Sequence, residues 1–301
     1  MSASFRVTQR SASLGVESNL QRGIAALQGL QDKLSSGREI SRPSDSPGGT
    51  SSALSLRGDI SRQTQFDRNA NDGGGWLAEA DNALQGSTQV MRRARDLGLS
   101  AVNSALSPVD REALAVEVDG LRAQLLSLSN SSRLGRPLFS GNALPAVGQP
   151  DVAYDATGNY VGDNGSVTRQ ISDGASVQVN LTGPAVFGPP GADAFKVLTD
   201  LAANIRTNPA AVTSVSINDL DTAMNRIQTG LATIGARTNQ LETIQSRNSI
   251  NRDNRVSSLN EIESIDIAKT SMELKLQELA YQASLASASR VIQPTLMDFL
   301  R

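Results

Sequence analysis

The chain has 301 residues, enough to bury the core of one or two domains, and its 28 basic and 30 acidic side chains leave a net charge of −2. This balance gives no electrostatic reason to expect binding to nucleic acid or to an anionic membrane surface. With no cysteine and no histidine, the chain lacks disulfides, thiolate metal sites and the most common general base. We therefore expect an association protein with no cofactor and no metal, not an enzyme.

Near the N-terminus, apolar residues recur at steps of three and four, which places them on one stripe of a helix. Gly37 lies where a C-terminal cap is expected, and Pro43 prevents the helix from continuing. Ser46 followed by Pro47 is typical of an N-cap with proline at the first position of the next helix. The stripe of this first helix contains Leu20, Ile24, Leu27, Leu30 and Leu34.

The second helical segment keeps a seven-residue rhythm of apolar positions but is interrupted by Gly73, Gly74 and Gly75. Three interior glycines cost about 3 kcal/mol relative to alanines, so helix propensity alone predicts a break here. Ser107, Pro108 and Asp110 then indicate a weak capping box that opens another helix. Its stripe contains Leu114, Val118, Leu121, Leu125 and Leu128.

Residues 134–192 are rich in glycine and proline and predict a small antiparallel β region. Alternation over 177–181 has a strand period of two, and Tyr160-Val161 with 167–171 are expected to be partner strands joined by a turn at 162–165. Helix returns over 193–207, and a long helix begins at Ile217. Near the C-terminus, Met272, Leu276 and Leu279 form another stripe, and the apolar ending at 296–301 is expected to dock on the N-terminal helix or on another subunit.

No run of 18 apolar residues occurs, so no membrane-spanning segment is expected. The first ten residues have neither the apolar core nor the small-residue site of a cleavable signal. If the protein leaves the cell, we expect a route that does not cut its N-terminus.

Several stretches of the chain match known sequence blocks in the same order and spacing. Residues 34–40 followed by Pro43-Ser44-Asp45-Ser46-Pro47 are similar, without a gap, to the N-terminal signature shared by flagellins and the hook-associated protein 3 family. Residues 68–84 and 263–268 are similar to two further blocks, although Ser264 stands where flagellins usually carry an acid. The ending at 296–301 is similar to the family's apolar terminus. The matches together cover 5–141 and 215–301.

Two motifs favour hook-associated protein 3, the hook-filament junction protein family, over flagellin. One is the Pro-Ser-Asp-x-Pro run at 43–47, and the other is Gly-Arg-Pro-Leu-Phe-Ser-Gly at 135–141, where flagellins favour Phe-Asn-Gly. The family also continues its helix through the region of Gly73 to Gly75, and we follow the family there against propensity.

The stripes and the resemblance together imply a mainly α fold, a long antiparallel coiled-coil rod formed by the N- and C-terminal segments with a small inserted antiparallel β domain. The expected parts are terminal assembly helices (1–45 with 258–301), a helical rod domain (46–133 with 193–257) and the β insertion (134–192).

The resemblance implies an extracellular axial protein of the bacterial flagellum, a junction ring between hook and filament. The implied partners are other copies of the chain, hook-associated protein 1, flagellin and a cytoplasmic export chaperone for type III export. Apolar stripes at the ends, with no partner inside the chain, are expected to order only on docking. Flagellin itself and a generic coiled-coil scaffold remain alternatives. The residues expected to carry assembly are Leu20, Ile24, Leu27, Leu34, Met272, Leu276, Leu279, Leu296 and Leu300, with Gly37, Pro43, Asp45 and Pro47 setting the turn.

Overall fold

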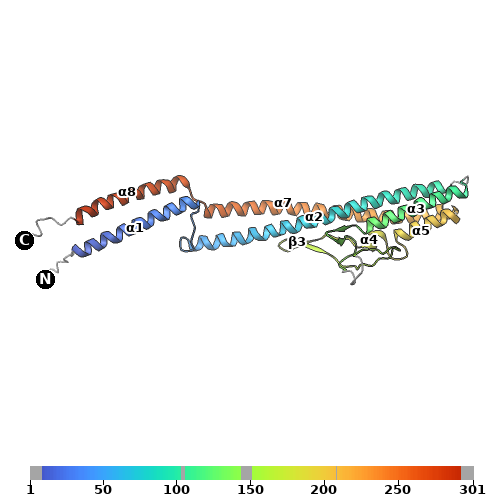
Figure 1. The fold of residues 1–301 in the computed structure, drawn as a ribbon, viewed down its shortest axis with the longest axis horizontal. Helices are drawn as coiled ribbons and strands as arrows, with labels where there is room; N and C mark the ends of the chain where they lie inside the picture. Colours follow the sequence, from blue (N-terminus) through green and yellow to red (C-terminus); the bar gives the residue numbers. More distant parts are fainter. Residues whose placement is uncertain (1–8, 103–105, 144–150, 208, 293–301) are drawn as a thin grey trace, which may run out of the picture. The chain divides into compact units, whose positions relative to one another are not determined.

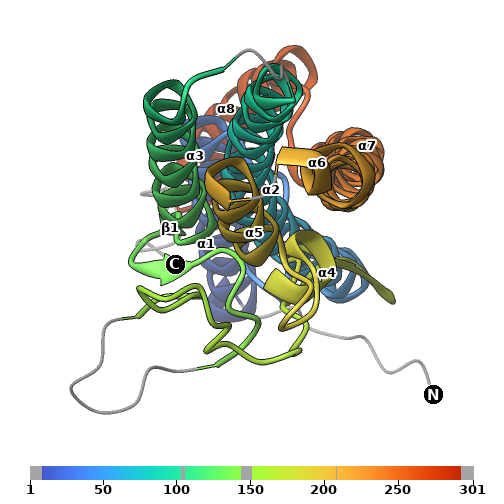
Figure 2. The ribbon, with the colours of Figure 1, turned by 90° about the vertical axis from the view of Figure 1, so that its right-hand side faces the viewer.

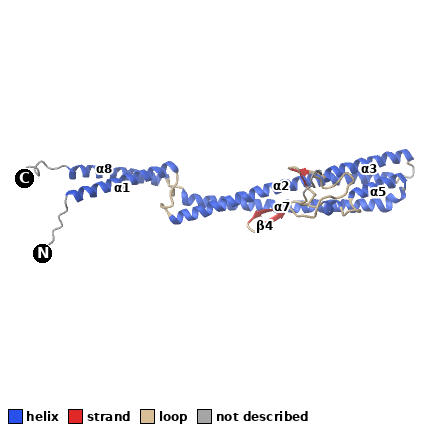
Figure 3. Ribbon diagram, turned by 60° about the horizontal axis from the view of Figure 1, so that its bottom comes forward, coloured by secondary structure: helices blue, strands red, loops and turns tan. Residues whose placement is uncertain are grey.

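A computed structural model describes residues 9–102, 106–143, 151–207 and 209–292. It is mainly helical, with two small antiparallel sheets (Figures 1 and 3). The described residues form two compact units, one of residues 9–61 with 252–292 and one within residues 62–251. The helices are α1 (Gln9–Ser36), α2 (Pro47–Ala101), α3 (Pro108–Ser129), α4 (Gly183–Phe187), α5 (Ala194–Thr207), α6 (Pro209–Ala211), the π-helical turn η1 (Val212–Ser216), α7 (Ile217–Glu263) and α8 (Ile267–Ile292), and the strands are β1 (Ser132–Arg133), β2 (Arg136–Pro137), β3 (Thr168–Ser172) and β4 (Ala175–Gln178).

The second unit is a bundle built from parts of α2 and α7 together with α3 and α5, and Figure 2 looks along these helices. Its core is aliphatic along the helices, where the apolar stripes predicted for α2, α3 and α7 are buried. Aromatic rings pack against one another beside the insertion, where Tyr154 lies 4.7 Å from Phe195 and Phe139 lies 5.4 Å from Phe187, centroid to centroid, and Trp76 adds a buried ring on α2. The buried helical residues include Leu77, Leu84, Met91, Val118, Leu125, Leu198, Leu201, Leu220, Ile227, Ile234 and Leu241.

The helix α2 runs without interruption through Gly73, Gly74 and Gly75, so the break predicted from propensity is wrong and the continuous helix implied by the family is confirmed. The reason is tertiary packing. A Cβ on Gly73 would lie 2.9 Å from Val179 Cγ1 and 3.3 Å from Leu241 Cδ1, and the Arg133 guanidinium lies over Gly75. Close approach of Val179 and Leu241 therefore favours glycine at Gly73, and packing of other segments on α2 offsets the poor helix propensity of the run.

The inserted region contains two hairpins, and its strand partners differ from the expected ones. Strand β3 pairs with β4 through the Asp173-Gly174 turn, with Thr168 opposite Gln178 and a bulge between Gln170 and Ser172. Tyr160 makes an isolated bridge with Tyr154, so the expected pairing of 160–161 with 167–171 is wrong. Strands β1 and β2 form the other hairpin, whose turn places Leu134 and Gly135 at positive φ.

Side chains of the helices hold this insertion by donating hydrogen bonds to its backbone carbonyls. Asn248 Nδ2 on α7 donates to the Ile171 oxygen at 2.7 Å, and Arg237 Nη1 donates to the Asn180 oxygen at 2.7 Å. Asn130, directly after α3, donates to the Tyr154 oxygen and accepts from the Ala153 and Tyr154 amides. The insertion therefore packs as part of the core of the second unit.

Helix boundaries follow the local chemistry that the sequence indicates. Ser107 caps α3 in a complete capping box with Asp110. Helix α2 begins at Pro47, and the Ser46 hydroxyl accepts from the Gly49 amide at 3.2 Å. These contacts satisfy amides that a helix N-terminus leaves unpaired.

Candidate assembly surface

The turn between α1 and α2 is formed by the predicted signature residues. Gly37 ends α1 at φ 69°, the left-handed conformation that glycine adopts without strain. The segment 42–45 is a turn with Pro43 at its second position, closed by the Asp45 amide donating to the Arg42 oxygen at 3.0 Å.

The Asp45 carboxylate stabilises this turn by accepting hydrogen bonds from its backbone. Its Oδ2 accepts from the amides of Arg42 at 2.7 Å and Ser41 at 3.1 Å. These two backbone hydrogen bonds favour the charged form and lower the pKa of Asp45. The side chain of Ile40 lies over Gly49, where a Cβ would come within 2.5 Å of Ile40 Cδ1. The signature therefore encodes one defined loop.

The break between α7 and α8 lies beside the break between α1 and α2. Arg38 and Ser264 form an isolated antiparallel bridge, in which the Glu39 amide donates to the Glu263 oxygen at 2.7 Å and the Ile265 amide donates to the Gly37 oxygen at 3.3 Å. Glu263 also pairs with Arg57 of α2 at 2.8 Å. Two segments far apart in the sequence therefore stop and restart their helices together.

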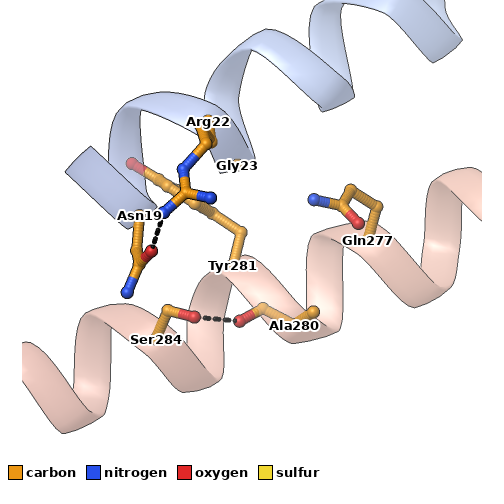
Figure 4. Close-up of a pocket in the computed structure, with 7 residues that line it drawn as sticks. All are labelled: Asn19, Arg22, Gly23, Gln277, Ala280, Tyr281 and Ser284. Carbon is orange, nitrogen blue, oxygen red and sulfur yellow. Dashed lines mark hydrogen bonds between the residues drawn. The ribbon is translucent and has the colours of Figure 1, made fainter. Parts of the chain in front are cut away.

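Beyond these breaks, α1 and α8 lie side by side and antiparallel (Figures 1 and 3). Tyr281 lies across Gly23, where a Cβ would be 3.2 Å from the ring (Figure 4). We call the facing surfaces of these two helices the seam. On α1 its half-buried residues are Val16, Leu20, Gly23, Leu27, Leu30 and Leu34, and on α8 its buried or half-buried residues are Thr270, Leu274, Gln277, Tyr281 and Ala288.

The seam is loosely packed and partly polar. Two open cavities of about 240 and 280 Å³ lie along it. Figure 4 shows the first, where Arg22 Nη2 donates to Asn19 Oδ1 at 2.5 Å and the Ser284 hydroxyl donates to the Ala280 oxygen at 2.8 Å. Both hydrogen bonds stay within one helix and do not join α1 to α8. The pairing therefore depends on a few apolar contacts.

The opposite face of α8 carries an exposed apolar stripe. Met272, Leu276 and Leu279 are 66%, 61% and 62% exposed and follow the four-three spacing that keeps them in line. They lie about half a turn from Thr270, Leu274, Gln277 and Tyr281 of the seam at 100° per residue. We call these three residues the outer stripe. The face of α8 that packs against α1 therefore includes the polar residues Thr270 and Gln277, whereas the opposite face exposes large apolar side chains.

The expectation that the apolar stripes of the end helices have no partner inside the chain is wrong for the residues of α1 that face α8. Leu20, Leu27 and Leu34 lie on the seam face of α1, because α8 packs there. Ile24 is 41% exposed and lies beside the seam. Met272, Leu276 and Leu279 form the outer stripe. Leu296 and Leu300 lie outside the described residues.

Sequence reasoning missed several residues that position this surface. Gly23 and Tyr281 fix the height at which α1 and α8 meet. Arg57 and Glu263 join α2 to the end of α7. The signal for Gly23 was a glycine within the apolar rhythm of the first helix, a position that can indicate close approach. The ion pair has no local signal, because its partners are 206 residues apart.

The described residues offer no metal-binding group of three or more His, Cys, Asp or Glu side chains. Among the same residues, no helix is both long enough and apolar enough to cross a bilayer. The contacts described at this surface are those of helix packing.

Comparison with known proteins defines the class to which this geometry corresponds. Residues 7–143 match the family described as the bacterial flagellin N-terminal helical region. The fold is shared with flagellar hook associated protein-3 of Legionella pneumophila (TM-score 0.61, 18% identity, 69% of this chain and 98% of that one) and with FlgL of Bacillus cereus (TM-score 0.60, 20% identity, 68% and 99%). The N-terminal region is therefore flagellin-like, and the predicted resemblance is confirmed.

Two kinds of flagellar protein are found among the curated relatives. Flagellar hook-associated protein 3 of Salmonella typhimurium is 26% identical over 280 residues, which cover 85% of this chain and 87% of that protein. Flagellin of Bacillus subtilis is 26% identical over 306 residues, covering 96% and 97%. Both relatives are structural components of the flagellum.

Proposed function

We propose that this chain is a structural axial protein of the bacterial flagellum that forms a junction ring between hook and filament and has no enzymatic activity. The observation that carries the proposal is the outer stripe of α8, a line of large apolar side chains left exposed by the chain's own packing. Soluble chains rarely leave such a line uncovered, and it is typical of a surface that another molecule covers.

The free energy available from burying the outer stripe supports its coverage by another molecule. Full burial of a Met or Leu side chain contributes about 1.5–3 kcal/mol, and each stripe residue still has about three fifths of its surface exposed. Covering all three would therefore contribute about 4 kcal/mol before the cost of association. The loose, cavity-containing seam supplies little to oppose a rearrangement of α8 on docking.

The proposal extends to partners and location. Other copies of the chain would cover the outer stripe, with hook-associated protein 1 on one side of the ring and flagellin on the other. A cytoplasmic chaperone would deliver the chain to type III export, and the assembled ring would be extracellular. Support for these partners comes from the motifs at 43–47 and 135–141 and from the relatives described above.

A stripe substitution tests the proposal. Leu276→Glu places a charge in the centre of the outer stripe and is expected to leave the monomer folded but unable to hold a filament on the hook. Ile267→Glu is the matched control, because Ile267 is 67% exposed on the same helix but lies off the stripe. Swimming, sheared-flagella composition and monomer circular dichroism are measured for both. Normal motility of Leu276→Glu would refute the assembly role of the stripe.

Flagellin remains the second candidate, because the Bacillus subtilis flagellin aligns with nearly the whole chain. Immunogold electron microscopy separates the two. Label confined to the hook-filament junction supports the junction ring, and label along the whole filament supports flagellin. Label that stays in the cytosol would reject both and favour a coiled-coil scaffold.

A further inference from the structure

Asn164 and Gly165 form the only Asn-Gly pair in the 301 residues, and they lie in the loop that precedes β3. The Asn164 side chain is exposed, and within the described part of the chain it makes no hydrogen bond. An asparagine followed by glycine is prone to spontaneous deamidation, because no Cβ hinders the approach of the glycine nitrogen to the asparagine side chain. The pair therefore has the chemistry for a covalent modification that needs no enzyme.

In the folded chain the nitrogen that would attack Asn164 is held by Asp163. The Gly165 amide donates to Asp163 Oδ1 at 2.9 Å, and the same oxygen accepts from the Asn142 amide at 2.6 Å. The hydrogen bonds from the Asn142 and Gly165 amides lower the pKa of Asp163 and keep its carboxylate charged. The Gly165 nitrogen must lose its proton to attack, and a carboxylate that accepts this proton in a hydrogen bond disfavours the negative charge that would develop there.

The Gly165 carbonyl begins a hydrogen-bonded connection from this loop to α7. It accepts from Asn180 Nδ2 at 2.9 Å, and Asn180 is 2% exposed. Asn180 Oδ1 accepts from the Val167 amide at 2.8 Å, and the Asn180 backbone oxygen accepts from Arg237 Nη1 at 2.7 Å. A change in backbone length between Asn164 and Gly165 would therefore displace a carbonyl to which a buried asparagine is bonded.

We propose that Asn164 is a site of spontaneous conversion to isoaspartate, that Asp163 slows this conversion in the folded chain, and that the conversion frees the loop from Asn180. The Gly165 nitrogen attacks Asn164 Cγ and forms a C–N bond, the bond from Cγ to Nδ2 breaks, and ammonia leaves a cyclic succinimide behind. Water then opens the ring. Opening at Cγ gives aspartate, and opening at the backbone carbonyl gives isoaspartate, whose main chain is longer by a methylene. The net reaction consumes a water and releases an ammonia, with no oxidation or reduction.

Ageing of the purified full-length chain measures this reaction. A folded sample and a urea-unfolded sample are kept at mildly alkaline pH, and the tryptic peptide 134–169 is analysed by mass spectrometry and by labelling with isoaspartyl methyltransferase. We expect modification at Asn164 in both samples and a faster rate in the unfolded one. Asn164→Ser should abolish the signal. A signal that persists in this variant would place the modification at another residue and overturn the proposal.

Two variants of the loop test the role of Asp163. Asp163→Ala frees the Gly165 amide and is expected to raise the rate in the folded chain at least about tenfold, which corresponds to the loss of a hydrogen bond to a charged group. Tyr160→Phe is the matched control, because it removes a hydroxyl that donates to the Phe139 and Asp163 oxygens and leaves the Gly165 amide in place. Its rate should stay near that of the original chain.

The same comparison shows what would refute this role. Equal acceleration by Asp163→Ala and Tyr160→Phe would mean that general loosening of the loop controls the rate. An equal acceleration by Asp163→Ala in urea would mean that the folded hydrogen bond is irrelevant. No acceleration by Asp163→Ala would exclude protection by the carboxylate.

Hydrogen exchange tests the structural consequence. The isoaspartate form is separated by chromatography and compared with Asn164→Asp, which carries the same charge on an unaltered backbone. We expect faster exchange of the Val167 amide in the isoaspartate form alone, because that amide donates to Asn180. Equal protection of Val167 in the two proteins would show that the modification leaves the connection to Asn180 intact, contrary to the proposal.

Discussion

The run Gly73-Gly74-Gly75 in α2 provides a matched pair of substitutions whose effects on stability should have opposite signs. Replacing a helix-interior glycine by alanine gains about 1 kcal/mol of helix propensity. At Gly74 the new Cβ would meet only Leu241 Cδ2 at 3.9 Å, an ordinary contact, so the full gain is expected. At Gly73 it would meet Val179 Cγ1 at 2.9 Å and Leu241 Cδ1 at 3.3 Å.

The neighbours of Gly73 cannot move away cheaply. Val179 is β-branched and 1% exposed, and Leu241 is 2% exposed, so both are fixed by the core. Overpacking of this kind costs about 1–3 kcal/mol, which exceeds the propensity gain over most of that range. We expect Gly73→Ala to destabilise the second unit by about 1 kcal/mol and Gly74→Ala to stabilise it by about the same amount.

Thermal and urea unfolding followed by circular dichroism measure the difference. For a unit of this size, 1 kcal/mol corresponds to a shift in Tm of about 2–4 °C, so the two variants should differ by about 4–8 °C. Equal stabilisation by both substitutions would show that propensity dominates, and the explanation of the continuous helix by tertiary contacts would be refuted.

Three further predictions concern individual side chains. Asn248→Ala should cost about 1–3 kcal/mol in urea unfolding, because Asn248 is 2% exposed and its loss leaves the Ile171 carbonyl without its donor, whereas Asn239→Ala at an exposed position of the same helix should be nearly neutral. Ser107→Ala should cost about 1 kcal/mol by removing the α3 cap, and Ser107→Thr, which keeps a hydroxyl that can accept from the Asp110 amide and donate to its carboxylate, should recover most of it. Hydrogen bonds from Thr157 and Asn159 lower the pKa of Asp155 to about 2, so its contribution to stability is complete above the ordinary value of about 3.9 and is lost as pH falls toward 2; an NMR titration midpoint near 4 would contradict this.

Features set by local chemistry could be predicted from the sequence. The cap at Gly37, the turn at Pro43 and Asp45, and the start at Pro47 each depend on residues within a few positions, and the structure has all of them. The buried faces of α3 and α7 could also be predicted, because an apolar stripe requires only that its partners be apolar.

Features set by distant contacts could not be predicted in this way. The glycines of α2 appear as helix breakers until Val179 and Arg133 are seen to occupy the space above them. The strand partner differs from the expected one for a different reason, because Asp173-Gly174 is a strong hairpin signal and joins β3 directly to β4. Residues 162–165 offered a competing turn in the same segment.

The assembly surface could be predicted only in part from the sequence. Leucine stripes at both ends indicated helix packing, but periodicity does not say which face of a helix its own chain covers. Only the pairing of α1 with α8 reveals that Thr270 and Gln277 face inward while Leu276 faces outward.

The signature turn sets the level of α1 relative to α8. The bridge between Arg38 and Ser264 ties the two helix breaks together, so α1 and α8 restart from a common level. Gly37 and Asp45 define the loop that makes this bridge possible. The most specific stretch of the sequence therefore acts through geometry, by setting the level at which α1 ends and α8 begins.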